Sequence, residues 1–333
     1  MRKKTLSVIL MIPHLYSSEK SKLYMLFKSI SKAKFKSRYP LDLKIIVHLD
    51  GIGDAGKKAA VEKSLNKKIN NPVYCTWSVK NIGFTGGINK AIDFARHNFN
   101  FNWFTVLNDD LILNENFFNI LFTGFQTKDI DVLSGKIKNI DGSLESFGLE
   151  YYKSGMALGN KKNNKPDYFC ATCFCLSRRM IEREISQTGY VFNPLYFIYG
   201  EDLELSLRLY KNNKNMRILN KVVAIHEGSR SVGYLSYIQV YCSFRNWLYT
   251  ILILWDINSI FANQGDIIIY QIKQFQFTLK KKYYFLYLRI IKDLFRNCFT
   301  LLSMRLQYKR VLKNFNKPLN LENLTEPSFL KIK

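Results

Sequence analysis

The fold of this chain is indicated most clearly by one stretch, residues 73–110, which reads VYCTWSVKNIGFTGGINKAIDFARHNFNFNWFTVLNDD. The stretch opens with an apolar run at 73–79 and closes with a second apolar run at 103–107, each bounded by turn residues. Between them, residues 86–98 carry apolar side chains at helical spacing. The stretch therefore predicts a strand, a covering helix and a second strand.

The same alternation is found on the N-terminal side. Apolar runs recur at 6–12 and 43–49, and helical spacing recurs at 19–33 and 56–68. Strands that alternate with helices predict an α/β fold whose mixed, mostly parallel sheet is covered by helices. Ligands of such sheets bind outside the carboxyl ends of the strands, so we expect the loops after Leu49, Val79 and Leu107 to line one site.

The C-terminal side of the chain has a different character. From about Ser134 the pattern breaks into shorter strand-like pieces, followed by an expected strand at 168–176 and a helix that opens near Glu201. Beyond Tyr241 the sequence is helical, aromatic and basic. We therefore predict a catalytic domain over residues 1–240 and a basic helical region over residues 241–333.

Charge and length restrict the classes of partner and location. The chain has 333 residues and a formal net charge of +24, which favours anionic partners such as nucleotide phosphates, nucleic acid or an acidic lipid surface. Residues 1–13 resemble a signal peptide, but no small-residue cleavage site follows, and we expect a buried strand there. The apolar run at 247–255 is shorter than the roughly 18 residues that cross a bilayer, so we expect no membrane span.

The six cysteines are scattered along the chain, and the default expectation is reduced thiols in the cytoplasm. Cys170 and Cys173 have the spacing of half a zinc site. Two further ligands at similar spacing are missing nearby, so packing within a strand is the preferred interpretation.

Two motifs follow strands at the predicted ligand edge. Residues 81–89 join a strand to a helix, where glycines and backbone N–H groups allow close approach of a ligand, although such a turn is often ordinary. Asp109 and Asp110 end the next strand, and adjacent carboxylates there suit a hard divalent cation bound to phosphates. A helix cap is the alternative for this pair.

Two further candidates lie downstream. Residues 201–204 place three carboxylates in the first turn of a helix, where a general base for a sugar hydroxyl could be held, although acidic residues are favoured at helix N-termini in any case. His226 closes an expected strand at 221–225. A single histidine is usually structural, but beside a metal or a pyrophosphate it could be a ligand.

A glycine loop at 51–56 supports a competing function. Gly51, Gly53 and Gly56 follow a strand and match the dinucleotide-binding pattern, as in an NAD-dependent dehydrogenase. The next strand, however, offers no acidic residue for the ribose, and Asp54 would point a charge at the pyrophosphate. We therefore prefer an ordinary loop there.

Taken in order, the segments between about residues 6 and 250 resemble the family 2 glycosyltransferases, particularly the rhamnosyltransferase-like members that build bacterial surface polysaccharides. The resemblance is carried by the order of five pieces. These are an acidic residue after a strand (Asp50), an Asn-x-Gly-x-x-Gly-Gly-x-Asn turn (Asn81 to Asn89), Leu-Asn-x-Asp (Leu107 to Asp110), Glu-Asp-x-x-Leu-Ser-x-Arg (Glu201 to Arg208), and a later His followed by Gly-Ser (His226, Gly228, Ser229).

The resemblance implies a GT-A type fold and a set of roles. Asp202 would be the catalytic base, while Asp110 and His226 would hold Mg2+ or Mn2+ on the diphosphate. Glu201, Arg208 and Thr172 would lie near the acceptor or support the site. The implied donor-binding residues are Asp50, Asn81, Gly83, Gly87, Asn89, Asn108 and Asp109.

Two departures from the family pattern affect these expectations. Asp109 stands where many members have proline, and Thr172 and Cys173 stand where a Gly-Ala pair commonly packs near the sugar or the acceptor. The first strand also ends in Met11-Ile-Pro-His-Leu-Tyr16 where the family usually has a Thr-Tyr-Asn type sequence, so the edge that contacts the base differs.

The expected reaction is direct displacement. A single base that deprotonates the acceptor on the face opposite the leaving diphosphate inverts the anomeric carbon, and no carboxylate nucleophile is required. The expected partners are a nucleoside-diphosphate sugar, with UDP or dTDP favoured, and a glycan or lipid-linked glycan acceptor of capsule, O-antigen or similar synthesis.

The basic C-terminal region has three interpretations. A nucleic-acid-binding protein would use the charge and the aromatic residues, but no known nucleic-acid motif accompanies them, and we expect no nucleic-acid partner. Residues 267–315 suit interfacial helices that dock a cytoplasmic enzyme on the inner face of the membrane. The same helices could instead pack on the catalytic domain or on a second subunit.

Overall fold

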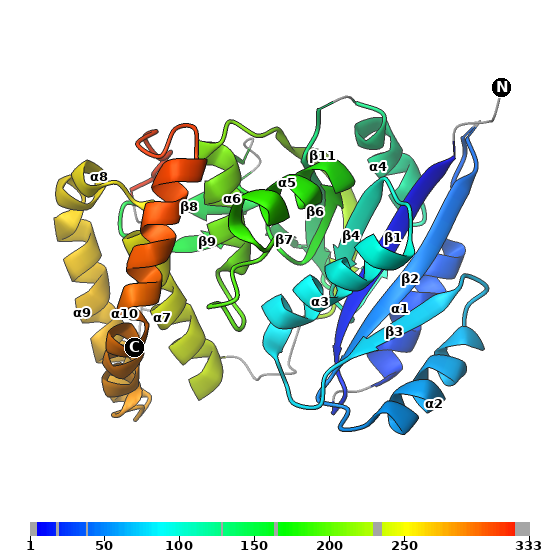
Figure 1. Cartoon of the computed structure of the whole chain (residues 1–333), viewed down its shortest axis with the longest axis horizontal. Coiled ribbons are helices and arrows are strands. Elements are labelled where there is room, and N and C mark those ends of the chain that lie inside the picture. The colour runs from blue at the N-terminus through cyan, green and yellow to red at the C-terminus, as the bar shows by residue number, and fades with distance from the viewer. Residues whose placement is uncertain are drawn as a thin grey trace.

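The protein is described from a computed structural model that covers residues 5–17, 20–37, 39–127, 129–162, 166–228 and 235–323. The described residues therefore exclude residues 1–4, where the first strand was expected to begin. They also exclude Arg230 and Ser229, the serine of the His-x-Gly-Ser piece. Figure 1 shows a long curled sheet at the centre, with the C-terminal helices gathered at one end.

The N-terminal half of the sheet is parallel. Its strands are β1 (Leu6–Leu15), β2 (Leu41–Asp50), β3 (Val73–Trp77) and β4 (Trp103–Leu107), in the spatial order β3-β2-β1-β4. Residues 10 and 11 of β1 pair with residues 45 and 46 of β2, and β4 pairs with β1 on its other side. Because these four strands run in one direction, their carboxyl ends lie along one edge of the sheet.

The second half makes the sheet mixed. It continues in the order β10-β6-β11-β5, with β10 (Cys173–Ser177) antiparallel to β4, and comprises β6 (Val132–Asn139), β11 (Met216–His226) and β5 (Leu111–Leu113). A short strand, β7 (Leu144–Ser146), pairs with β6, and β8 (Leu149–Tyr151) and β9 (Ala157–Gly159) form a separate hairpin. Since β10 is antiparallel to β4, the start of β10 reaches the edge where β4 ends.

Helices cover both faces of the sheet because alternate residues of each strand point to opposite sides. Leu10 and Ile12 of β1 pack in the same core as α1 (Lys20–Lys32), α2 (Ala55–Asn66) and α4 (Phe117–Phe125). Ile9 and Met11 pack on the other face with α3 (Gly83–Asn98), α5 (Arg178–Thr188) and α6 (Glu201–Lys211).

The C-terminal helices share a core with the segment that precedes them. They are α7 (Tyr237–Leu254), α8 (Ile257–Ala262), α9 (Gln264–Lys280) and α10 (Leu286–Val311). Trp247 and Tyr308 belong to the same buried cluster as Tyr151 and Leu207. The Tyr308 hydroxyl also donates to the Glu204 carboxylate of α6 at 2.5 Å. The expected division into a catalytic domain over residues 1–240 and a basic helical region over residues 241–333 stays a prediction.

The alternating pattern expected from the sequence is confirmed, with differences at element ends. The strand expected over 221–225, for example, begins already at Met216. The strand expected over 168–176 begins only at Cys173, because the backbone N–H groups of Phe169 and Ala171 donate to side chains of α6 instead of to a neighbouring strand. The strand expected over 73–79 ends at Trp77. The helix expected from residue 86 begins at Gly83, so most of the glycine-rich turn forms the first turns of α3.

The glycine loop at 51–56 has a local explanation. Asp54 is the N-cap of α2, and its carboxylate accepts from the Lys57 N–H at 2.8 Å. A carboxylate thus occupies the position where a dinucleotide-binding helix would receive the pyrophosphate.

All six cysteines are free thiols. Cys173 packs within β10 as expected, whereas Cys170 precedes that strand. Among the described helices, none combines the length and the apolar character needed to cross a bilayer.

Candidate active site

The carboxyl edge of the parallel strands collects the residues that the sequence separates. β2 ends in Asp50, β4 leads into Asn108, and β11 ends in His226. Backbone hydrogen bonds join the end of β4 to the residue before β10 and the next loop to the end of β11, because the Asn108 N–H donates to the Thr172 carbonyl at 3.2 Å and the Glu227 N–H donates to the Asp110 carbonyl at 3.1 Å. Since β2 and β4 both run parallel to β1, the loops that follow them lie at one edge of the sheet, as expected; that these loops line one site stays a prediction.

Asp50 organises the turn that leads into α3. Its carboxylate accepts from the Ser78 hydroxyl at 2.5 Å, the Ile82 N–H at 2.9 Å and the Gly83 N–H at 3.0 Å. Burial raises the pKa of Asp50, but hydrogen bonds from His48, Ser78 and Ile82 outweigh this and hold the pKa below its usual value. Asp50 is thus ionised and fixes the start of the helix.

The glycine of this turn is required by its surroundings. The Asn81 side-chain oxygen accepts from the Gly83 N–H at 2.9 Å, and Gly83 has a φ of +76°. A Cβ there would lie 2.3 Å from the Phe197 carbonyl oxygen. Any other residue at position 83 would therefore push α3 away from the 197 segment.

Gly87 and Asn89 also serve packing. A Cβ on Gly87 would lie 2.7 Å from the His48 ring. The Asn89 side chain donates to the Phe192 carbonyl at 2.7 Å and accepts from the Phe192 N–H at 3.0 Å. Their predicted contact with a donor stays a prediction, because in this arrangement both residues hold α3 against neighbouring segments.

The two carboxylates after β4 have different partners. The carboxylate of Asp109 lies 2.7 Å from Nδ1 of His14, at the end of β1. The carboxylate of Asp110 is buried, and its Oδ1 lies 3.0 Å from Nε2 of His226. The two adjacent aspartates thus contact different histidines, and only Asp110 contacts His226, the histidine predicted to bind metal.

Glu145 completes this group, and the sequence gave no motif that identified it. Its carboxylate lies 2.8 Å from Nδ1 of His226 and therefore fixes which nitrogen of the ring faces Asp110. Burial lowers the pKa of His226, but the carboxylates of Asp110 and Glu145 outweigh it and raise the pKa to about 10. The carboxylates of Asp110 and Glu145 thus flank the histidine from two sides.

The side-chain atoms with which Asp110 and His226 face each other are of the kinds that bind a cation. Oδ1 of Asp110 and Nε2 of His226 are buried and lie 3.0 Å apart, but not in hydrogen-bond geometry, and the buried Oδ1 of Asn108 has no hydrogen-bond partner among the described residues. Within those residues no group of three or more histidine, cysteine or acidic side chains is arranged to hold a metal. A hard cation that takes one or two protein ligands, with water and phosphate oxygens for the rest, matches this donor set.

Asp202 lies at the start of α6, partly exposed, beside the strand end that carries Thr172. Its carboxylate accepts from the Ala171 N–H at 3.0 Å and from the Leu203 N–H at 2.8 Å. The segment 171–172 therefore holds Asp202 through one residue and Asn108 through the next.

The neighbouring Glu201 is buried, and its Oε2 has no hydrogen-bond partner within the described part of the chain. Burial and the charge of Asp202 raise the pKa of Glu201 to about 8. Burial also raises the pKa of Asp202, but the N–H groups of Ala171 and Leu203 oppose the rise by stabilising its anion. The N–H groups of Ala171 and Leu203 thus favour the ionised form of Asp202.

A pH-dependent stability follows from the raised pKa of Glu201. Between the ordinary value of 4.5 and about 8, folded Glu201 keeps a proton that the unfolded chain has released, so the free energy of unfolding falls as the pH rises. We expect Glu201→Gln to remove this dependence. Between about pH 5 and about pH 8, the free energy of unfolding of the variant should rise relative to that of wild type by on the order of a few kcal/mol. Urea unfolding of both proteins at the two pH values measures it, and parallel pH slopes would contradict the assignment.

Arg208 and Thr172 support the site in different ways. Arg208 has no exposed surface, and its guanidinium contacts Glu184 at 2.5 Å and Glu204 at 2.9 Å, which ties α6 to α5. Thr172 is buried at the start of β10 and offers its carbonyl to Asn108. In this structure Arg208 is out of reach of a substrate and acts through packing.

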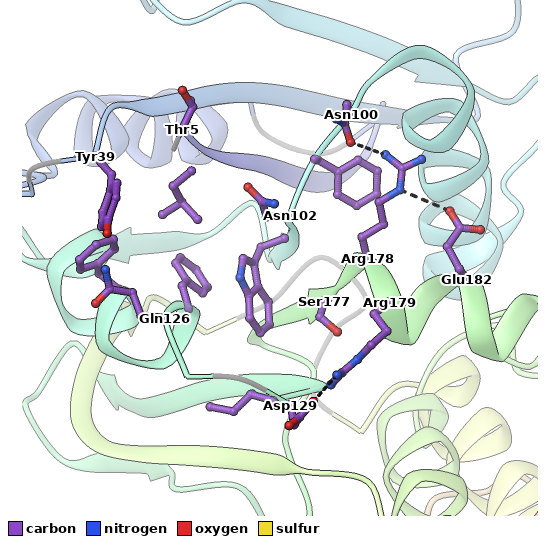
Figure 2. A pocket seen from close by; sticks show the side chains of 16 residues that line it. Thr5, Tyr39, Asn100, Asn102, Gln126, Asp129, Ser177, Arg178, Arg179 and Glu182 are labelled. Atoms are coloured by element: carbon purple, nitrogen blue, oxygen red, sulfur yellow. Dashed lines mark hydrogen bonds and ion pairs between the residues drawn. The ribbon is translucent and has the colours of Figure 1, made fainter. Parts of the chain in front are cut away.

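A cavity of about 880 Å³ lies at the opposite edge of the sheet, where β1 and β4 begin. Figure 2 shows that its charged side chains pair with one another, Arg178 with Glu182 and Arg179 with Asp129. None of the predicted site residues lines it. Its size alone therefore does not make it the active site.

This mixed α/β sheet, covered by helices on both faces, has the architecture of a GT-A type fold. The sequence model described as glycosyl transferase family 2 matches residues 16–186, which is half of the chain. The chain belongs to this family. The matched part includes Asp50, Asp110 and Glu145 and ends before Asp202 and His226.

Relatives and solved structures agree with this class. The chain is 31% identical over 200 residues to the low-salt glycan biosynthesis hexosyltransferase Agl10 of Haloferax volcanii, a match that covers 57% of this chain and 62% of that protein. GalNAc-T7, solved with UDP, GalNAc and Mn2+, aligns with a TM-score of 0.55 at 12% identity over 75% of this chain and 48% of its own. S. aureus TarS aligns with a TM-score of 0.50 at 15% identity over 81% and 43%. These two likenesses concern the fold.

Proposed function

We propose that this protein is an inverting glycosyltransferase that moves a hexose from a nucleoside-diphosphate sugar to a hydroxyl group of a glycan. Asp202 is the catalytic base, and Asp110 and His226 hold the cation of the donor diphosphate. One observation carries the proposal. The segment 171–172 hydrogen-bonds both Asp202 and the residue after β4, so the base and the diphosphate end of the site are positioned by one piece of backbone.

The chemistry needs one base only. The acceptor oxygen attacks the anomeric carbon as the bond from that carbon to the diphosphate oxygen breaks, and Asp202 takes the acceptor proton. Attack from the face opposite the leaving group inverts the configuration of the anomeric carbon. The pKa of Glu201, raised to about 8, favours Asp202 for this role, because an acid that is still protonated cannot accept a proton.

A bound Mg2+ or Mn2+ would stabilise the negative charge that develops on the leaving diphosphate. Asp110 and His226 would supply the ligand atoms on the protein side, the cation displacing the proton from Nε2 of His226, and Glu145 would orient the histidine. The Mn2+ in the structure of GalNAc-T7 supports a divalent cation for this fold.

The donor and acceptor classes follow from related proteins and charge. UDP in the structure of GalNAc-T7 supports a UDP sugar, with dTDP as the alternative nucleotide. The hexosyltransferase of glycan biosynthesis supports a hexose and a glycan or lipid-linked glycan acceptor. We place the reaction on the cytoplasmic side of the membrane in the synthesis of a surface polysaccharide such as capsule or O-antigen.

A donor screen tests the proposal. We expect UDP or dTDP sugars to raise the melting temperature in the presence of Mn2+, whereas a nicotinamide dinucleotide should have no effect. Slow hydrolysis of the accepted donor, followed by NMR before anomers equilibrate, should release the sugar with inverted configuration. Retention of configuration, or stabilisation by the dinucleotide alone, would refute the proposed reaction.

A further inference from the structure

One side of α10 carries a continuous row of exposed apolar residues. Phe295 and Phe299 are the most exposed, at 76% and 83%. The row repeats every three or four residues along the whole helix and comprises Leu288, Ile291, Phe295, Phe299, Leu302 and Leu306. At 3.6 residues per turn these positions share one side, opposite the buried Ile290, Leu301 and Tyr308.

α9 has the same arrangement. Its buried side, which includes Tyr270 and Phe277, packs on Trp247 and Phe244 of α7. Its outer side exposes Ile268, Ile269, Ile272, Phe275 and Leu279. Figure 1 shows α9 and α10 at the outer end of the molecule, away from β1, β2 and β3. We call the exposed rows of these two helices the α9–α10 face.

An apolar groove adjoins the exposed row of α10. It has a volume of about 460 Å³ and is lined by Leu252 of α7 and by residues of α10, among them Ile291, Phe295 and Leu302. Arg305 provides its charged group, and that guanidinium donates to the Leu252 and Trp255 carbonyls at 2.7 Å. Apart from Arg305, the residues that line the groove are thus apolar.

The charges beside the face are almost all positive. Residues 257–312 contain ten lysines and arginines but only two acidic residues, Asp266 and Asp293. Asp293 already accepts from the Tyr241 hydroxyl and lies 3.6 Å from Arg245. The exposed cations include Lys280, Lys281, Lys282, Lys292, Arg296, Lys309 and Arg310.

We propose that the α9–α10 face binds the surface of a bilayer that contains anionic lipid. Apolar rows flanked by lysine and arginine let side chains enter the acyl boundary while the cations remain among the headgroups. A second copy of the chain is the weaker candidate, because two such faces would bring like charges together. The proposal goes beyond glycosyl transfer and holds for any donor sugar.

The face is directly connected to the catalytic helix. The buried side of α10 places the Tyr308 hydroxyl 2.5 Å from Glu204, two residues after Asp202. A bilayer on the outer side of α10 would therefore lie one helix away from α6. This arrangement suits an acceptor that is itself anchored in the lipid.

Sedimentation of the full chain with vesicles tests the proposal without any sugar present. We expect the protein to pellet with equal mixtures of phosphatidylcholine and phosphatidylglycerol at low salt, and to be released by high salt. Phe295→Glu combined with Phe299→Glu should lower the bound fraction about 10-fold or more, and so should glutamine at Lys280, Lys281 and Lys282. Ile140→Glu is the matched control, because Ile140 is 65% exposed and lies just after β6.

Several outcomes would overturn the proposal. These are wild-type protein that stays in the supernatant at low salt, equal binding to pure phosphatidylcholine vesicles, and full binding by a folded double variant. A dimer in analytical ultracentrifugation that the same substitutions dissociate, with no vesicle binding, would assign the face to a second copy. Donor hydrolysis is measured in parallel in detergent-free buffer. Because it needs no vesicles, it tests the proposed enzyme activity independently of membrane binding.

Discussion

Asp202→Asn is expected to lower the rate of glycosyl transfer by about a hundredfold to ten-thousandfold, which is the usual contribution of a positioned base. The asparagine oxygen can still accept from the Ala171 N–H, so the start of α6 should keep its place. Donor binding, measured by calorimetry with Mn2+, should therefore remain nearly unchanged. The loss should appear in kcat and spare the affinity for the donor.

Glu201→Gln provides the matched control for this experiment. Near neutral pH Glu201 is protonated, and its neutral carboxyl group is close in shape and charge to the glutamine amide. We expect this variant to keep most of the activity. If Asp202→Asn retained more than about a tenth of wild-type turnover, Glu201 would become the next candidate for the base.

Asp110→Ala is expected to weaken the binding of a nucleoside diphosphate with Mn2+ by about 10–100-fold or more. That range is typical for the loss of a residue that only orients a metal ligand, and Asp110 is itself the proposed ligand. Asp110 is buried and faces Nε2 of His226, so its removal takes away the carboxylate of the proposed cation site. Excess chelator should abolish transfer by the wild-type protein, and added Mn2+ should restore it. Undiminished transfer in chelator would contradict the proposed role of the cation.

Asp109→Ala is the control, because it removes the adjacent carboxylate but leaves the contact between Asp110 and His226 in place. The partner of Asp109 is His14 of β1, so we expect a smaller loss that reflects the position of β1 relative to β4. Equal losses from the two substitutions would indicate that both carboxylates bind the cation jointly.

The alternation of strands and helices could be predicted because it depends on local patterns. Period and turn residues give the positions of β1, β2, β3, β4 and α3 to within a few residues. The errors occur where a distant segment competes for the backbone. Residues 168–172 look like part of a strand, yet two of their N–H groups bond to Ser206 and Asp202 of α6.

The carboxylates and the histidine of the motifs could also be predicted from the sequence, since each motif follows a strand or opens a helix. Their pairing could not. His14 and Asp109 are 95 residues apart, and Glu145 and His226 are 81 residues apart. Glu145 belongs to no motif, and only the pairing of β7 with β6 brings it to the edge where β11 ends.

The sequence by itself therefore determined the order of the elements, the edge of the sheet at which the site forms and the carboxylates available there. Tertiary structure decided that Asp109 and Asp110 face different histidines, that Arg208 is buried, and that burial raises the pKa of Glu201. The physical reason is the range of the forces. Backbone preferences act over a few residues, whereas contacts, burial and pKa values depend on which distant segments meet in space.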